Sequence, residues 1–192
     1  AHQLVHLACW AHCRRDFNDA LQALPKNART VDQLAAQFMA LIAQLYAVEA
    51  KARERELGVQ ELLEQRQLHS VPVLQKIEAL LLANIHVVLP GSLLGKALHY
   101  MSGQWSKLKL YVTAGEYPID NNACENSIRP FVIGRKNWLF SDTVAGANAS
   151  ANLYSLMQTC AVNAVDGYQY LRALLTASDN ATSNGGFMQG RG

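Results

Sequence analysis

Apolar side chains recur at helical spacing along most of this 192-residue chain. Between Trp10 and Leu24 they fall on one helical face, and from Thr30 to Ala52 they keep the period of a long amphipathic helix. The same period predicts further helices over residues 73–81, 94–108, 153–161 and 168–175. The pattern therefore predicts a mainly α-helical protein.

Three segments depart from this period. Residues 4–9 (LVHLAC) are a short apolar run, which we interpret as a buried strand. After Gly115 the sequence predicts an extended stretch, a brief helix toward Pro130 and a polar turn at residues 134–137. From Ser178 onward the chain is rich in Ser, Asn and Gly without an apolar period, so we expect disorder there.

Composition narrows the class of protein. Half of the residues are apolar and 17% are charged, so the chain can bury a core. Its formal net charge of +2 is too small to indicate nucleic-acid binding, and any DNA contact must come from local Arg and Lys clusters. The cysteine spacing, the lack of a signal-peptide pattern and the lack of a long apolar run favour a cytoplasmic protein without a membrane segment.

The segment IDNNACENSIRP, residues 119–130, carries the most informative acid. Asn122 followed three residues later by Glu125 fits a variant of the helix capping box. Alternatively, Glu125 faces a cleft and binds a divalent metal, with Arg129 one turn later reaching a phosphate. The local spacing leaves both interpretations open.

The segment CWAHCRR would place Cys9, His12 and Cys13 on one helical face. No second Cys/His pair lies at a usable spacing, so the pattern favours a buried cysteine and tryptophan over a zinc site. The adjacent Arg14 and Arg15 are candidates for phosphate contact, with ordinary surface charge as the alternative.

Two other charged segments differ in what they predict. Arg135 and Lys136 lie on the predicted turn beside an apolar anchor, which suits phosphate binding, although a solubilising loop is the alternative. In KARERE, residues 51–56, acids and bases nearly cancel, so a solvated helix face is favoured over a DNA-binding surface. Gly58 is expected to stop this helix.

Several motifs in one order resemble the transposases of the insertion-sequence-sixty-six family of bacterial mobile elements. They are CWAHCRR, LGKALHYMSGQW, IDNNACENSIRPFVIGRKNWLF, LYSL and YQYLRALL, and they cover nearly the whole chain up to about Thr176. The resemblance implies an RNase H-like (α/β) catalytic domain of the Asp-Asp-Glu type with a large all-helical insertion. This chain would be a C-terminal fragment of that domain.

The resemblance divides the chain into four parts. Residues 1–29 would hold the last strand and a helix of the partial RNase H-like core, and residues 30–115 the helical insertion. Residues 116–176 would hold the helix of the third acid, the basic turn and the C-terminal helices, and residues 177–192 a disordered tail.

The resemblance also implies the site. Glu125 would be the final metal-binding acid of a magnesium-dependent enzyme that acts on transposon-end DNA, with a homodimer possible on that DNA. The cations expected to hold DNA phosphates are Arg14, Arg15, Arg129, Arg135 and Lys136. The two Asp ligands would lie upstream, so we expect this chain alone neither to cleave nor to join DNA. The alternative is a non-enzymatic helical module for DNA binding or self-association.

Overall fold

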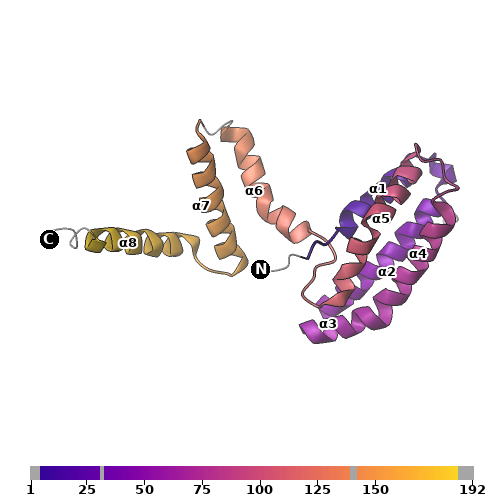
Figure 1. Cartoon of the computed structure of the whole chain (residues 1–192), viewed down its shortest axis with the longest axis horizontal. Helices are drawn as coiled ribbons and strands as arrows, with labels where there is room; N and C mark the ends of the chain where they lie inside the picture. Colours follow the sequence, from indigo (N-terminus) through magenta and orange to yellow (C-terminus); the bar gives the residue numbers. More distant parts are fainter. Residues whose placement is uncertain (1–4, 31–32, 139–141, 186–192) are drawn as a thin grey trace, which may run out of the picture. The chain divides into compact units, whose positions relative to one another are not determined.

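All regular elements of the computed structural model are helical in the part of the chain that it describes, residues 5–30, 33–138 and 142–185 (Figure 1). Side chains are described for these ranges except residues 135–138 and 178–185. The elements are α1 (Trp10–Gln22), η1 (Lys26–Ala28), α2 (Leu34–Glu54), α3 (Val59–Gln65), η2 (Arg66–Ser70), α4 (Val71–Asn84), α5 (Leu93–Leu108), η3 (Lys109–Thr113), α6 (Asn122–Trp138), α7 (Val144–Val162) and α8 (Gly167–Gly185). The mainly α prediction is confirmed.

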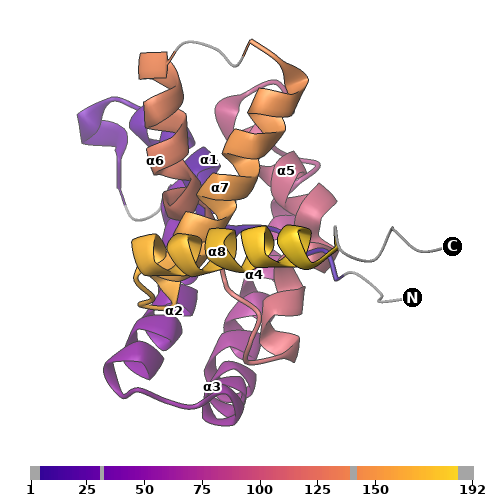
Figure 2. The ribbon, with the colours of Figure 1, turned by 90° about the vertical axis from the view of Figure 1, so that its left-hand side faces the viewer.

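The chain forms two compact units, residues 1–123 and 124–192. In the first unit α1 packs against α2 and α5, and α4 packs against both of these helices, as Figures 1 and 2 show. Its core contains stacked rings of Phe17 and Phe38 and an edge-on contact between Trp10 and Trp105. The Trp10 indole also donates a hydrogen bond to the Leu108 carbonyl at 2.9 Å, so α1 is fixed to the end of α5.

The second unit is described separately and consists of α7, α8 and most of α6. Phe131 of α6 contacts Tyr154 of α7 edge-on, with ring centroids 4.9 Å apart. Cys160 of α7 is buried near the start of α8, where Gly167 lies against Met157. None of the helices described in either unit combines the length and apolar character needed to cross a membrane.

The strand predicted at the start of the chain is wrong for its described residues, 5–9. Cys9 has extended backbone angles, but a strand also needs a neighbouring strand as hydrogen-bond partner. Here the Ala8 N–H donates to the Lys107 carbonyl and the Trp10 N–H donates to the Ile119 carbonyl. The segment is therefore an extended connection held by helical and loop backbone.

Two predicted interruptions are also wrong. Helix α6 continues through Pro130 to Trp138, so residues 134–137 are helical and do not form a turn. A proline inside a helix removes one hydrogen bond and its ring clashes with the preceding turn, a local cost that does not prevent the following residues from staying helical. Helix α8 continues to Gly185 although disorder was expected from residue 177, because adding a residue to an existing helix is far easier than starting one. The remaining tail, residues 186–192, lies outside the described residues.

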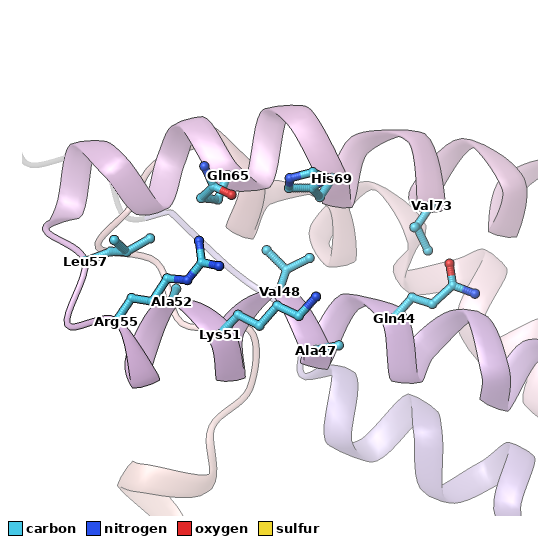
Figure 3. Close-up of a pocket in the computed structure, with 10 residues that line it drawn as sticks. All are labelled: Gln44, Ala47, Val48, Lys51, Ala52, Arg55, Leu57, Gln65, His69 and Val73. Atoms are coloured by element: carbon cyan, nitrogen blue, oxygen red, sulfur yellow. The ribbon is translucent and has the colours of Figure 1, made fainter.

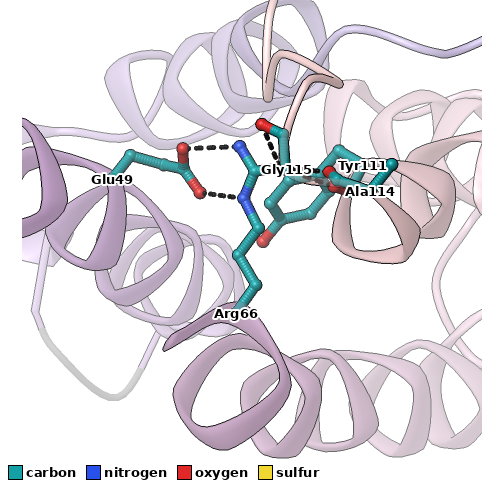
Figure 4. Close-up of polar contacts among 5 residues, drawn as sticks. All are labelled: Glu49, Arg66, Tyr111, Ala114 and Gly115. Atoms are coloured by element: carbon teal, nitrogen blue, oxygen red, sulfur yellow. Dashed lines mark hydrogen bonds and ion pairs between the residues drawn. The ribbon is translucent and has the colours of Figure 1, made fainter. Parts of the chain in front are cut away.

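The buried side chain of Arg66 joins three segments of the first unit (Figure 4). Its guanidinium forms two 2.8 Å hydrogen bonds with the Glu49 carboxylate of α2. It also donates to the carbonyls of Tyr111 and Ala114, at 2.8 and 2.7 Å, and lies over the Tyr111 ring. Arg66 is 1% exposed, so this charge depends on these partners for its stability.

Helix α2 ends in a hydrogen-bonded turn with Glu56 in the left-handed region, at a φ of 51°. The Glu56 N–H donates to the Arg53 carbonyl and the Leu57 N–H donates to the Ala52 carbonyl, which is the Schellman pattern. The prediction that Gly58 stops this helix is wrong. Gly58 precedes α3, and its N–H donates to the Glu61 carboxylate at 2.8 Å.

Replacing Arg66 with Met should lower the free energy of unfolding by about 3–5 kcal/mol, because Glu49 would be left buried without its cation. Urea titration followed by far-UV circular dichroism measures this change. The double variant Arg66→Met, Glu49→Leu should lose less than the sum of the two single variants. The exposed Arg53→Gln is the control, expected within about 0.5 kcal/mol of the parent. A loss under about 1 kcal/mol for Arg66→Met would contradict the assignment.

The variant Glu56→Gly should raise the free energy of unfolding by about 1 kcal/mol, because glycine adopts the left-handed conformation without steric cost. The same urea titration measures it. Arg53→Gly, at an exposed position inside α2, should instead lower stability by about 1 kcal/mol. Equal destabilisation by both variants would show that Glu56 is not strained.

Candidate functional site

The turn before α6 is fixed by backbone bonds within the first unit. Ile119 is buried, and its carbonyl accepts the Trp10 N–H at 3.2 Å. The next residue, Asp120, is partly buried and precedes the start of α6 by two positions. Asp120, whose carboxylate lies at the start of α6, is therefore held next to α1 by the backbone hydrogen bond of its neighbour Ile119.

Asp120 accepts three hydrogen bonds from two elements. Tyr46 of α2 donates its hydroxyl to Oδ2 at 2.9 Å. Asn122 donates its backbone N–H to Oδ1 at 3.0 Å and its side-chain amide to Oδ2 at 2.9 Å. A carboxylate at a helix start satisfies a free N–H and interacts favourably with the helix dipole.

The expected cap residue was therefore misplaced. Asn122 was predicted to cap the helix, whereas it is the first helical residue and its N–H is bonded by Asp120. An aspartate side chain commonly accepts a hydrogen bond from the backbone N–H two residues later. The capping-box pattern considered only Asn122 and Glu125, so it did not identify Asp120.

Sequence reasoning missed Tyr46 altogether. It lies within the apolar stripe of α2, 74 positions before its partner Asp120. Burial, and then the hydrogen bond to Asp120, raise the pKa of Tyr46 above its ordinary value. The phenol stays protonated and keeps its role as donor.

A hollow of about 300 Å³ lies beside this turn, lined in part by Cys9, His12, Asp120 and Asn121. The Asn121 N–H donates to the Cys9 sulfur at 3.4 Å. Among the residues whose placement is described, no group of three or more His, Cys, Asp or Glu side chains could hold a metal ion.

The packing role predicted within CWAHCRR is confirmed. Trp10 and Cys13 are both fully buried in the core of the first unit. Burial, followed by the nearby Asp16 carboxylate, raises the pKa of the Cys13 thiol. Cys13 therefore stays a neutral packing residue.

Glu125 and Arg129 share one face of α6. Glu125 lies in the first turn, Arg129 follows four residues later, and both side chains are exposed. Residues at this spacing are neighbours on a helix surface, so the carboxylate and the guanidinium face the same side. These two predicted site residues therefore lie on one exposed face of α6.

The other predicted cations are distributed over two helices. Arg14 and Arg15 are exposed neighbours on α1, in the first unit. Arg135 and Lys136 lie on α6, in the second unit, where the backbone is helical and their side chains are outside the described set. The basic turn that was expected to carry them is replaced by a continuation of the helix that bears Glu125.

Comparison with known proteins gives one family and three relatives. The family described as "Transposase IS66 family" matches residues 1–149. Three uncharacterized proteins of Sinorhizobium fredii (strain NBRC 101917 / NGR234) are similar: y4qI is 30% identical over 92% of this chain, and y4jD and y4hP are 29% and 27% identical over 87% of it. The chain spans 31% of the length of each relative. No solved structure matches significantly.

Replacing Tyr46 with Phe should loosen the start of α6, because Asp120 loses one donor. The amide of Asn122 should exchange with deuterium about fivefold faster, which corresponds to about 1 kcal/mol for one hydrogen bond. Tyr117→Phe, at a partly buried tyrosine of the same unit, is the control and should leave this exchange unchanged.

The pH dependence gives a second readout of the same variant. A raised folded-state pKa means that Tyr46 contributes stability below its ordinary pKa of 10.0 and loses it progressively as the pH rises further. Unfolding titrations should therefore show a smaller loss of stability above pH 10 in Tyr46→Phe than in the parent. Identical profiles would refute the contribution of Tyr46.

Proposed function

Because the chain belongs to the IS66 family of transposases, we propose that it supplies the part of a transposase catalytic region that carries the third metal-binding acid, Glu125. The observation that supports this most is the position of Glu125. It is exposed in the first turn of α6, within the family match, and directly after the turn that Asp120 holds. An acid buried in a local cap would have contradicted the proposal.

The described residues by themselves do not fit a pair of magnesium ions. Such a pair requires several oxygen ligands, and the described part of the chain offers no cluster of three suitable side chains. We infer that Glu125 would give one carboxylate ligand and that two further acids would come from the longer protein. The chain accordingly has no complete catalytic centre of its own in this proposal.

The folding context belongs to the same proposal. An RNase H-like sheet would be formed by sequence beyond this chain, and the extended segment at residues 5–9 would connect that sheet to α1. Residues 30–115 would then be the helical insertion.

The remaining proposed roles follow from charge. Arg129 on the face of Glu125, and Arg14 and Arg15 on α1, would hold the phosphates of transposon-end DNA. Arg135 and Lys136 would extend the same function along α6. A homodimer on DNA is the proposed assembly.

A chimera of y4qI in which this chain replaces the matching third tests the proposal. It should cleave and join element-end DNA with magnesium, and Glu125→Gln should lower the rate more than about a hundredfold, because loss of even an outer-shell partner commonly costs 10–100-fold. The measurement is a gel assay with end-labelled duplexes.

Two controls sharpen this experiment. Glu116→Gln removes an exposed acid outside α6 and should keep the rate within about twofold. The 192-residue chain alone should show no magnesium-dependent nicking. Nicking by the chain alone, or full activity of the Glu125→Gln chimera, would overturn the proposal.

A further inference from the structure

A groove lined by basic and amide side chains lies between α2 and the opposite helical segment of the first unit (Figure 3). It encloses about 360 Å³. Arg55 extends from α2 toward Gln65 on the facing segment, Lys51 runs along α2, and Val48 projects between the two segments. Cations and amide donors from two elements therefore converge on one space.

In the KARERE segment, residues 51–56, positive and negative charges nearly cancel in number, but the helix places them on different faces. Lys51 and Arg55 are four residues apart and so lie on one face, where both line the groove. Glu54 and Glu56 are exposed and are not among the lining residues. None of the ten residues that line the groove is acidic, so the lining carries a net positive charge from Lys51 and Arg55.

Two hydrogen-bonded turns form the ends of the groove. His69 belongs to the π-helical turn η2 (Arg66–Ser70), a distortion that is frequent at functional sites. In this turn Arg66 points into the core and is neutralised by Glu49, so the Glu49 carboxylate is held by the core. At the other end, the turn at Glu56 holds Leu57 against the groove.

We propose that this groove binds a phosphate group of the DNA backbone. The choice of DNA as the polyanion rests on the proposed function. The preference for a phosphate group rests on the cationic and amide side chains that line the groove. Lys51 and Arg55 supply charge, Gln65 supplies amide donors, and apolar walls such as Val48 and Val73 reduce screening by water. Such a contact would position the duplex without reading its sequence.

The test uses the full 192-residue chain and a fluorescent 30-base-pair duplex, with affinity measured by anisotropy across a salt series. The double variant Lys51→Gln, Arg55→Gln should bind about tenfold more weakly at low salt and lower the salt slope by about 1. The matched control Arg53→Gln, Lys76→Gln also removes two exposed cations, one from α2 and one from α4, neither of which lines the groove. It should stay within about twofold of the parent.

Circular dichroism and urea titration of both double variants exclude loss of folding as the cause. Equal losses of affinity in the two variants would overturn the proposal, because binding would then follow net charge alone. An unchanged DNA affinity in the groove variant would also overturn the proposal. This holds even if the variant no longer binds inorganic phosphate, as measured by calorimetry.

The outcomes separate this inference from the proposed function. If the groove variant binds DNA normally and the Glu125→Gln chimera is inactive, the proposal that the groove binds DNA is refuted and the proposed catalytic role of Glu125 is retained. A weakened groove variant together with a fully active Glu125→Gln chimera would do the reverse.

Discussion

The Arg66 guanidinium can stay in the apolar interior only while its charge is neutralised and its N–H groups are bonded. Glu49 on α2 provides the opposite charge, and the carbonyls of Tyr111 and Ala114 accept hydrogen bonds from Nη1. Because Arg66 and these partners lie on three separate segments, the requirement fixes α2, the π-helical turn and the segment after α5 in one arrangement. Two features depend on that arrangement: the loop that leads to α6, and the groove beside α2.

The loop after α5 connects this buried charge to the candidate site. It begins beside the carbonyls that Arg66 binds, passes Gly115 and ends at Asp120. A Cβ at Gly115 would lie 2.1 Å from the Val59 carbonyl oxygen, so only glycine permits this close approach to α3. The carboxylate of Asp120 then meets Tyr46 from α2. The helix that bears Glu125 thus begins at a position set by residues far away in sequence.

The two units differ in the kind of chemistry they can contribute. The first unit has a closed core that includes the buried Arg66, and it carries Lys51 and Arg55 as an exposed pair on α2. The second unit carries Glu125 and Arg129 on one exposed helical face. The groove cations therefore lie in the first unit, whereas the proposed metal ligand and the cation beside it lie in the second.

The sequence by itself determined most of the helices and the family, since helical periodicity and ordered motifs are local properties that can be read without knowledge of contacts. It also identified Cys13 and Trp10 as packing residues. Only the tertiary structure showed that residues 5–9 have no partner strand and that α6 continues through Pro130. It also showed that Asp120 accepts the N–H of Asn122 at the start of α6. Strand pairing and buried hydrogen bonds depend on partners distant in the chain, and a linear pattern does not contain the distances between them.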